Sequence, residues 1–495
     1  MKRRMERGAG ILLSITSLPS PYGIGTMGKA AYEFVDVLVE TGQKYWQVLP
    51  LGPTSYGDSP YQSFSAFAGN PYLIDLDLLK EQGLLKEKDL TGVPFGDKED
   101  DIDYGLLYEN RYKVLLKAFK RFDRSSEKYR KFCGENKSWL NDYSLYMAIK
   151  NSRGGKSFTE WEPALRDREK ETLAKCKREL KKEIHFWKFL QFTFFEQWDR
   201  LKSYANEKGI RIIGDIPLYV AFDSADVWAK REQFKLDCEG RPVEVAGCPP
   251  DAFSDDGQKW GNPLYDYERM EKDGFDWWRR RMMANARLFD IIRIDHFIGV
   301  ARYYSIPAQD QNARNGRWNK GPGRKLIDVI EKTLGKNRII AEDLGVAVPA
   351  VKKLLKKTGW PGMKVLLFAF DGNTGNEHLP YNYENGNLVA YTGTHDNETI
   401  VGYFAEKTEE ELAFIYDFLN ISKREEIPDA IIRAAYGSVA DIVILQMQDI
   451  LKLGNEARMN FPSTVGTNWR WRLVKDSFTD ERKEFIKMLT FVCGR

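Results

Sequence analysis

The chain has 495 residues, enough for about three average domains or for one large α/β barrel with insertions. Its 75 Lys and Arg residues nearly balance 72 Asp and Glu, and the net charge of +3 excludes a strongly basic nucleic-acid-binding protein. Five scattered cysteines without a CxxC pair and four histidines without HxxxH spacing argue against a disulfide framework and a zinc site. No apolar run reaches the ~18 residues of a membrane helix, and we expect a cytoplasmic protein with no membrane partner.

Short apolar runs, each bounded by Gly, Pro or Asp, recur along the chain and predict eight β-strands. They cover residues 11–15, 45–49, 210–217, 291–295, 338–343, 363–370, 388–391 and 442–445. Helical patterns at residues 30–41, 325–334 and 349–357 separate several of them. Apolar strands that alternate with helices predict a parallel sheet of the α/β class, and eight of them predict a closed (β/α)8 TIM barrel. The last run stays open, because residues 441–451 also fit a helix.

The predicted strands are unevenly spaced, and the long gaps between them indicate insertions on the barrel loops. We place these insertions at approximately residues 52–209, 218–288 and 299–337 and expect them to be largely helical. No internal repeat, low-complexity segment or Pro/Ser-rich linker separates them. The whole of residues 1–495 is therefore predicted to be a single catalytic domain.

The fourth predicted strand ends with Arg293-Ile294-Asp295-His296. Residues two apart on a strand share a face, and at the C-terminal end of a barrel strand that face opens to the active-site mouth. A guanidinium beside a carboxylate lowers the pKa of the carboxyl group and keeps it ionised, as a nucleophile requires. The alternative is a structural ion pair between Arg293 and Asp295.

The fifth predicted strand ends with Glu342 and Asp343. These two side chains face opposite ways if the strand continues, and whichever points inward lies one strand from Asp295. Two carboxylates on neighbouring strand ends are the minimum that glycosidic bond cleavage requires. The alternative is a rim carboxylate that caps a helix.

After the seventh predicted strand come His395, Asp396 and Asn397. A third carboxylate with a histidine suits the binding of sugar hydroxyls, and the alternative is an N-cap for the next helix. The three polar groups occur in the order in which a barrel would present them, which favours a shared site over three separate structural roles.

Two further segments match known motifs only in part. Residues 23–28 fit GxGxxG, but residues 17–22, with two prolines, separate them from the preceding strand, which favours a turn over a nucleotide site. Residues 247–265 are rich in turn formers and contain Trp260, and we expect a mobile lid over the substrate. Calcium binding by Asp251, Asp255 and Asp256 is disfavoured because they lack the EF-hand pattern.

At these motifs the sequence resembles the 4-α-glucanotransferases known as amylomaltases or disproportionating enzymes, a family related to the α-amylases. The resemblance runs nearly end to end. The matching segments are residues 17–19, 45–51, 59–66, 214–217, 249–265, 293–297, 341–345, 392–397 and 456–460. The family implies a (β/α)8 barrel with helical insertions, no cofactor, and maltooligosaccharides and other α-1,4-glucans as partners.

The resemblance also implies a role for each matching residue. Asp295 is the expected nucleophile, Glu342 the general acid/base, and Asp396 the carboxylate that holds ring hydroxyls and helps to distort the sugar. The expected substrate contacts are Arg293, His296, His395, Asp215, Trp260, Tyr61 and Asn397, with no metal ligand.

These roles imply transfer of α-1,4-glucan segments from a donor maltodextrin to the 4-OH of an acceptor, through a covalent glucosyl-enzyme and with retention. We expect Glu342 to be protonated in the free enzyme, because burial and the Asp295 charge disfavour its ionised form. Three alternatives stay open: an α-glucan hydrolase with the same carboxylates, a non-catalytic glucan-binding protein, and an unrelated barrel enzyme such as a metal-dependent aldolase.

Overall fold

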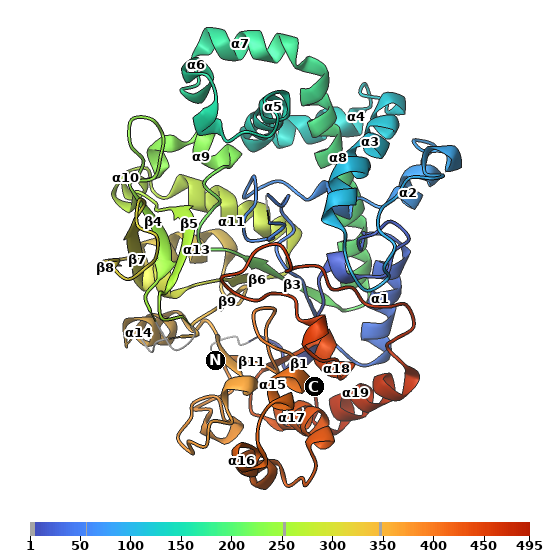
Figure 1. Ribbon diagram of the computed structural model, residues 1–495, viewed down its shortest axis with the longest axis vertical. Helices are drawn as coiled ribbons and strands as arrows, with labels where there is room; N and C mark the ends of the chain where they lie inside the picture. Colours follow the sequence, from blue (N-terminus) through green and yellow to red (C-terminus); the bar gives the residue numbers. More distant parts are fainter. Residues whose placement is uncertain (1–4, 56, 251–253, 346–348) are drawn as a thin grey trace.

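The computed structural model describes residues 5–55, 57–250, 254–345 and 349–495 (Figure 1). Its centre is a parallel eight-stranded sheet in the order β10-β11-β12-β1-β2-β3-β6-β9. The strands are β1 Gly8–Leu12, β2 Tyr45–Gln47, β3 Arg211–Ile216, β6 Ile291–Ile294, β9 Ile339–Ala341, β10 Gly362–Val365, β11 Leu388–Tyr391 and β12 Ile442–Gln446. The two ends of the sheet, β9 and β10, approach each other, and the Ala341 amide donates a 3.0 Å hydrogen bond to the Pro361 carbonyl. The sheet is therefore a nearly closed barrel.

Each of the eight predicted runs overlaps a barrel strand, although β1 begins and ends three residues before the predicted run 11–15. Strand β12, the open case, has the sequence Ile-Val-Ile-Leu-Gln and is buried at every position, because a parallel barrel strand is covered on both faces. A short helix, α18 Met447–Ile450, follows it directly. The sixth predicted run is shorter than expected, because the chain leaves β10 for a 3-10 turn at Leu366–Phe368.

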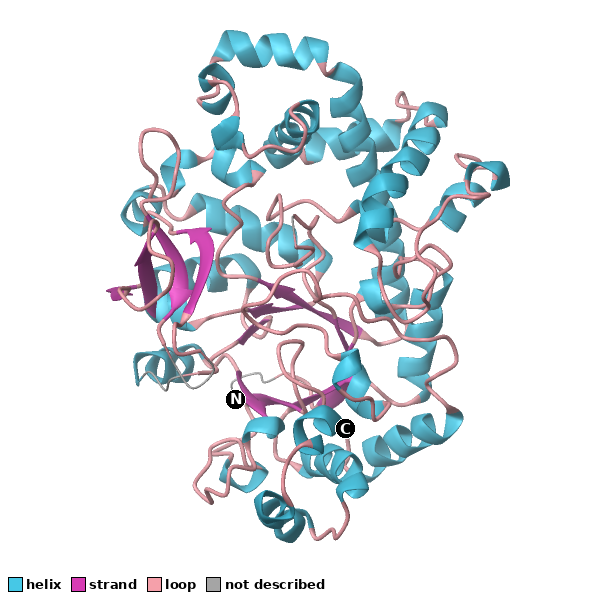
Figure 2. Cartoon of the chain, viewed as in Figure 1, coloured by secondary structure: helices cyan, strands magenta, loops and turns pink. Residues whose placement is uncertain are grey.

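Helices cover the outside of the barrel (Figure 2). Contacts of α8 with β3, α11 with β6 and α17 with β12 hold them against the strands. The helices around the barrel are α1 Lys29–Glu40, α8 Lys181–Glu207, α11 Asp276–Leu288, α12 Ile298–Ala301, α13 Arg324–Leu334, α14 Pro349–Thr358, α15 Ile400–Ala405, α16 Glu409–Leu419, α17 Ile427–Gly437 and α19 Asp480–Val492. Each of the three helical patterns predicted from the sequence corresponds to one of them, α1, α13 or α14.

The first insertion is helical, as predicted, and rises above the barrel in Figure 1. Its helices are α2 Leu76–Glu81, α3 Tyr104–Arg121, α4 Glu127–Glu135, α5 Lys137–Ser152, α6 Pro163–Arg166 and α7 Lys170–Glu179, and α9 Ala225–Ala229 and α10 Tyr267–Lys272 follow in the second insertion. Aromatic rings fill its interior, for example Phe122 and Phe189 with centroids 4.8 Å apart. One buried apolar cluster runs through the barrel and this insertion together.

A second sheet is present that the sequence patterns do not predict. Strands β4 Glu244–Cys248, β5 Gln258–Pro263, β7 Arg302–Pro307 and β8 Arg317–Lys320 form an antiparallel sheet in the order β5-β4-β7-β8. Strands from the second and third insertions meet in it. The segment 247–265, expected to be a turn-rich mobile lid, contains the last two residues of β4 and the whole of β5, and residues 251–253 within it lie outside the described residues. Its pairing partner β7 is distant in sequence, and local turn signals do not reveal such pairing.

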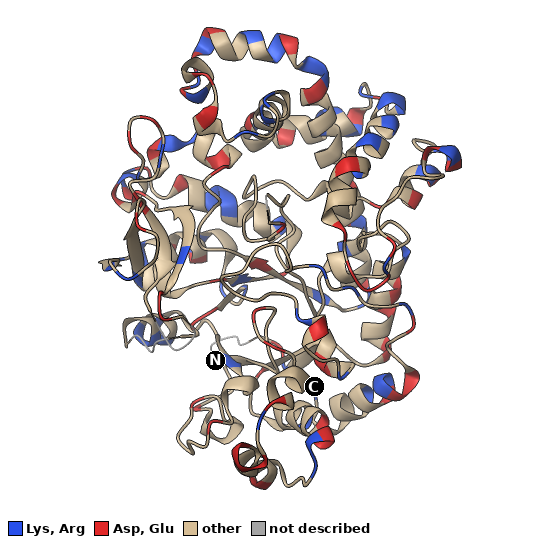
Figure 3. Cartoon of the chain, viewed as in Figure 1, with Lys and Arg blue, Asp and Glu red and all other residues tan. Residues whose placement is uncertain are grey.

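Charged residues of both signs lie along the outer helices α7 and α19 (Figure 3), in agreement with the near-zero net charge. Within the part of the chain that the structure describes, no helix is both long and apolar enough to span a membrane.

Candidate active site

Three neighbouring strands bring polar side chains to the C-terminal end of the barrel. Asp215, near the end of β3, lies in register with Arg293 on β6. Asp295 and Glu342 directly follow β6 and β9, and their backbone amides donate to carbonyl oxygens of the neighbouring strand at 2.9 and 3.0 Å. The hydrogen bonds of the sheet therefore continue into both residues and fix the position of the backbone from which each carboxylate side chain extends.

Arg293 is the buried cationic centre of the site. Its guanidinium donates to both carboxylate oxygens of Asp215, at 2.8 and 2.7 Å, and to Oδ1 of Asp295 at 3.0 Å. The predicted common face of Arg293 and Asp295 is thereby confirmed. Although burial opposes it, the charges of Asp215 and Asp295 hold the pKa of Arg293 well above its ordinary value. The guanidinium thus stays charged and orients both carboxylates.

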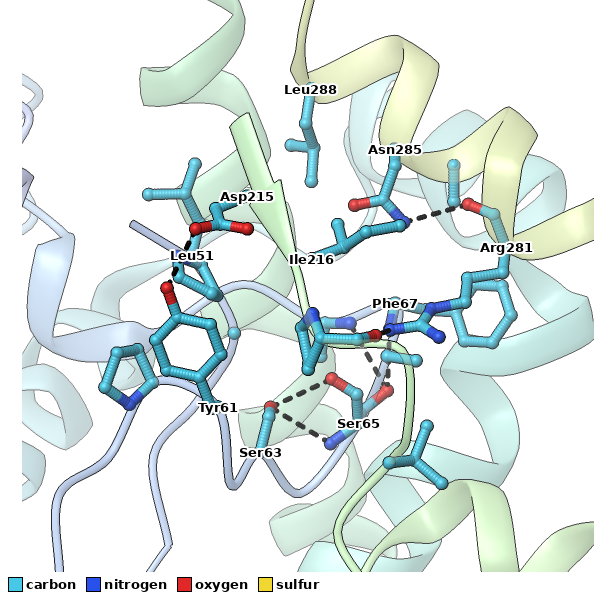
Figure 4. A pocket seen from close by; sticks show the side chains of 18 of the residues that line it. Leu51, Tyr61, Ser63, Ser65, Phe67, Asp215, Ile216, Arg281, Asn285 and Leu288 are labelled. Atoms are coloured by element: carbon cyan, nitrogen blue, oxygen red, sulfur yellow. Dashed lines mark hydrogen bonds between the residues drawn. The ribbon is translucent and has the colours of Figure 1, made fainter. Parts of the chain in front are cut away.

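An aromatic group lies beside this ion pair. The Tyr61 hydroxyl donates a 2.8 Å hydrogen bond to Oδ2 of Asp215, and the close-up in Figure 4 shows Tyr61 pointing at that carboxylate. The Tyr61 ring stacks on the His395 imidazole with centroids 5.0 Å apart and planes 18° from parallel. Trp469 lies 5.7 Å from Tyr61 and 5.8 Å from His395, centroid to centroid. These three rings form a wall with flat apolar faces and polar edges, which suits the binding of sugar rings.

The pocket in Figure 4 shares Tyr61 and Asp215 with this group. Its other walls, from the segment after β2, the end of β3 and helix α11, are largely apolar, and none of Asp295, Glu342 and Asp396 lines it. The pocket therefore borders the candidate catalytic residues without containing them.

Glu342 and Asp343 turn in different directions, as expected for consecutive residues of a strand. Glu342 accepts two hydrogen bonds from backbone amides, one from His296 and one from Leu344, each at 2.7 Å. Asp343 instead accepts from the Met363 amide, toward β10, at 2.8 Å. Glu342 is therefore the carboxyl group that lies beside Asp295.

His296 has a left-handed backbone, with φ of +52°, a region that only a few per cent of non-glycine residues occupy. This conformation directs its N–H at Glu342 while its ring meets the Trp260 indole edge to face, with centroids 4.7 Å apart. Burial lowers the pKa of His296 to about 4, and its imidazole is neutral near pH 7. The β4–β5 hairpin thus reaches the site through Trp260.

Asp396 and His395 lie in the turn that follows β11. The Asn460 side-chain amide donates to Oδ1 of Asp396 at 2.6 Å, and Nε2 of His395 lies 3.4 Å from Oδ2. Oδ1 of the Asn397 side chain accepts from both the backbone amide and the hydroxyl of Thr394, at 2.8 and 2.9 Å. Asn397 therefore shapes the turn, and its predicted contact with substrate stays a prediction.

The carboxyl groups of Asp295 and Glu342 interact electrostatically. Burial raises the pKa of both, and the charge of Asp295 adds to the rise for Glu342 while Arg293 opposes the rise for both. The prediction that Arg293 leaves Asp295 with a lowered pKa is therefore wrong in net direction, because burial outweighs the guanidinium. The upward pKa shift is larger for Glu342, which favours Glu342 as the protonated member of the pair, the direction expected from the sequence.

Asp396 has the opposite shift. Burial raises its pKa, but the His395 imidazole and the Asn460 amide outweigh burial and hold the pKa below the ordinary aspartate range. Asp396 in turn raises the pKa of His395 against the effect of burial. The site thus combines one carboxyl group with a lowered pKa, Asp396, and one with a raised pKa, Glu342.

Asn460 and Trp469 are residues of this site that the sequence patterns do not reveal. Both follow the last barrel strand and reach the mouth of the barrel because the chain folds back over it after α18. The one signal for Asn460 is its place in the matching segment 456–460, and nothing local points to Trp469.

No group of three or more His, Cys, Asp or Glu side chains that could hold a metal ion occurs within residues 5–55, 57–250, 254–345 and 349–495. Asp256, one of the residues considered for calcium, accepts a 2.7 Å hydrogen bond from Nε of Arg314. Asp251 lies outside the described residues.

A family model described as 4-alpha-glucanotransferase matches residues 13–476. The chain belongs to the 4-alpha-glucanotransferase family. The resemblance inferred from the sequence is thereby confirmed. The 4-alpha-glucanotransferase of Clostridium butyricum is 50% identical over 488 residues, which cover 98% of this chain and 100% of the relative. The 4-alpha-glucanotransferase of Thermus thermophilus is 47% identical, over 96% of this chain and 97% of the relative.

Solved structures agree with this assignment. The amylomaltase from Streptococcus agalactiae in complex with acarbose matches with a TM-score of 0.96 and 44% identity, over 99% of this chain and 100% of that one. The amylomaltase from Corynebacterium glutamicum has a TM-score of 0.79 at 18% identity, over 98% of this chain and 75% of that one, and supports the fold alone. Family membership removes the unrelated metal-dependent barrel enzyme as an alternative.

Proposed function

We propose that residues 1–495 form one catalytic domain that transfers α-1,4-glucan segments from a donor maltodextrin to the 4-OH of an acceptor glucan or glucose. The observation that carries the proposal is the pairing of Asp295, held by Arg293, with Glu342, whose pKa is raised, in a chain that matches the Clostridium butyricum glucanotransferase over that relative's full length.

In the first step, Asp295 attacks the anomeric carbon of the donor and forms a β-glucosyl ester. The glycosidic C–O bond breaks, and Glu342 gives its proton to the departing oxygen. Arg293 orients the nucleophile through the 3.0 Å contact, and the raised pKa of Glu342 keeps the required proton in place at neutral pH.

In the second step, the acceptor 4-OH attacks the same carbon, Glu342 takes its proton, and Asp295 is released with overall retention. The electrostatics favour this change of role. Formation of the ester removes the charge of Asp295, which is one of the causes of the raised Glu342 pKa. The pKa of Glu342 therefore falls in the intermediate, and the carboxylate becomes available as a base.

Asp396, ionised by its partners, is proposed to accept hydrogen bonds from ring hydroxyls of the sugar that bears the reacting carbon. Asn460 fixes one of its oxygens and leaves the other beside His395. The wall of Tyr61, His395 and Trp469 offers an apolar face for the same sugar, and Asn397 contributes by shaping the turn.

Transfer exceeds hydrolysis when the intermediate meets a sugar before it meets water. We propose that Trp260 and its hairpin, packed on His296, exclude water and form part of the acceptor site. The alternative, an α-glucan hydrolase, uses the same carboxylates but lacks this preference. We also place the activity in the cytoplasm, because the few scattered cysteines suit a reducing compartment.

Incubation with maltotriose alone tests the proposal. A ladder of longer maltodextrins plus glucose is the expected result. If maltose and glucose are the only products, the protein is a hydrolase and not a transferase. If no product forms although the protein binds glucan measurably, it is a glucan-binding protein. Acarbose, present in the Streptococcus agalactiae structure, serves as the binding probe: calorimetry should detect it with both the wild type and Asp295→Asn.

A further inference from the structure

Asp449 is a buried carboxylate outside the reaction described above. It lies in α18, directly after β12, and is 1% exposed. Its Oδ2 accepts a 2.6 Å hydrogen bond from the Thr392 hydroxyl, and its Oδ1 accepts a 2.8 Å bond from the Ile400 backbone amide. The Gln446 side-chain amide lies 3.4 Å from Oδ2. All three partners are neutral, and a buried carboxylate without a cation is costly unless such bonds satisfy it.

The two main partners of Asp449 are the two ends of one segment. Thr392 leaves β11, and Ile400 begins α15, while His395 and Asp396 lie between them. A single carboxylate group therefore bonds both ends of the turn that carries a proposed substrate-binding pair. The Thr392 hydroxyl also accepts from the backbone amide of Gln446, at 3.2 Å, which ties this end to β12 as well.

We propose that Asp449 is a positioning residue that, through Thr392 and Ile400, holds the 392–400 segment so that Asp396 meets the sugar in its reactive conformation. This inference rests on the proposed function. Packing supports it: a Cβ at Gly393 would lie 2.3 Å from Nε2 of Gln446 and one at Gly402 2.1 Å from Oδ1 of Asn455. The segment is thus closely packed near both ends, and loss of one anchor shifts the turn between them.

The matched variants are Thr392→Val, which removes the hydroxyl at nearly constant volume, and Thr392→Ser, which keeps it. With maltotriose we expect Thr392→Val to lower kcat by roughly 10- to 100-fold with a small change in KM, since displacements of about 1 Å cost up to about 10²-fold. Thr392→Ser should stay within about threefold of wild type. Asp449→Asn keeps only one acceptor oxygen and therefore loses its bond to either Thr392 or Ile400, so kcat should fall in this variant as well.

A double-mutant cycle with Asp396→Asn separates positioning from general destabilisation. The cycle uses an aryl α-maltoside, whose leaving group needs little protonation, so that weak variants remain measurable. If Thr392 acts through Asp396, Thr392→Val lowers kcat by less than about a further twofold when Asp396→Asn is already present. An equal loss of kcat in both backgrounds, or a Thr392→Val variant as active as wild type, overturns the inference.

Thermal unfolding of every variant establishes the folded fraction, and Asp449→Asn replaces Thr392→Val if the latter does not fold. A wild type that forms no maltodextrin ladder would refute the proposed function instead.

Discussion

The backbone amide of His296 donates a 2.7 Å hydrogen bond to Oε2 of Glu342. The donor is the residue that follows Asp295, and it reaches Glu342 from a left-handed backbone with φ of +52°. The proposed nucleophile and the proposed acid/base are thus joined through the main chain as well as by charge. Strain in such a position persists only where the surrounding structure enforces it, and it concentrates at functional sites.

Replacement of His296 by Ala and by Gly isolates this strain, because both variants lose the imidazole and only Gly adopts the left-handed region without cost. We expect His296→Ala to be less stable than His296→Gly by about 1 kcal/mol. Urea unfolding of the two proteins measures the difference. Equal stabilities, or a more stable Ala variant, would mean that the left-handed backbone is not maintained in solution.

The pH dependence of kcat/KM should follow the two raised pKa values. Asp295 must be ionised to attack, and activity falls as pH drops through its pKa, which burial places above the ordinary aspartate range. Glu342 must be protonated, and activity falls as pH rises through its pKa, which burial and the Asp295 charge raise. The expected profile is a bell whose two limbs both lie above the usual carboxyl range. A profile without a basic limb near neutrality would contradict the assignment of Glu342.

The loss of activity in Glu342→Gln should depend strongly on the leaving group of the donor. General acid assistance is worth roughly 10²–10⁴-fold, and the loss should approach that size for maltotriose but be much smaller for an aryl α-maltoside. Asp295→Asn should lose several orders of magnitude with both donors, because no glucosyl ester can form. Initial rates with the two donors provide the test, and near-wild-type activity of either variant with maltotriose would refute its role.

Trp260→Ala should lower the ratio of transfer to hydrolysis by up to about tenfold, because an aromatic contact of this kind is worth roughly 0.5–1.5 kcal/mol. Trp318→Ala is the matched control. Trp318 is 37% exposed in the same antiparallel sheet and packs on Arg302 rather than on His296. Free glucose per bond broken, measured with maltotriose, gives the ratio. If Trp260→Ala leaves this ratio unchanged, the hairpin does not keep water away from the intermediate.

The barrel could be predicted from the sequence because each strand is a short apolar run with turn residues at its ends, a local signal. The candidate carboxylates could be predicted for the same reason, since Asp295 and Glu342 directly follow such runs and the alternation of a strand decides which side chains share a face. The family resemblance added the roles, including that of Tyr61, whose local sequence contains no chemical signal.

Only the tertiary structure decided the remaining features, because they depend on contacts between distant segments. The antiparallel sheet joins strands from two insertions, and Asn460 and Trp469 come from a loop that folds back over the barrel. Protonation also depends on burial: Arg293 beside Asp295 predicts a lowered pKa, yet removal of water from the site outweighs the guanidinium. Sequence by itself determined which groups stand at the strand ends, and the enclosing fold determined their partners and their charge.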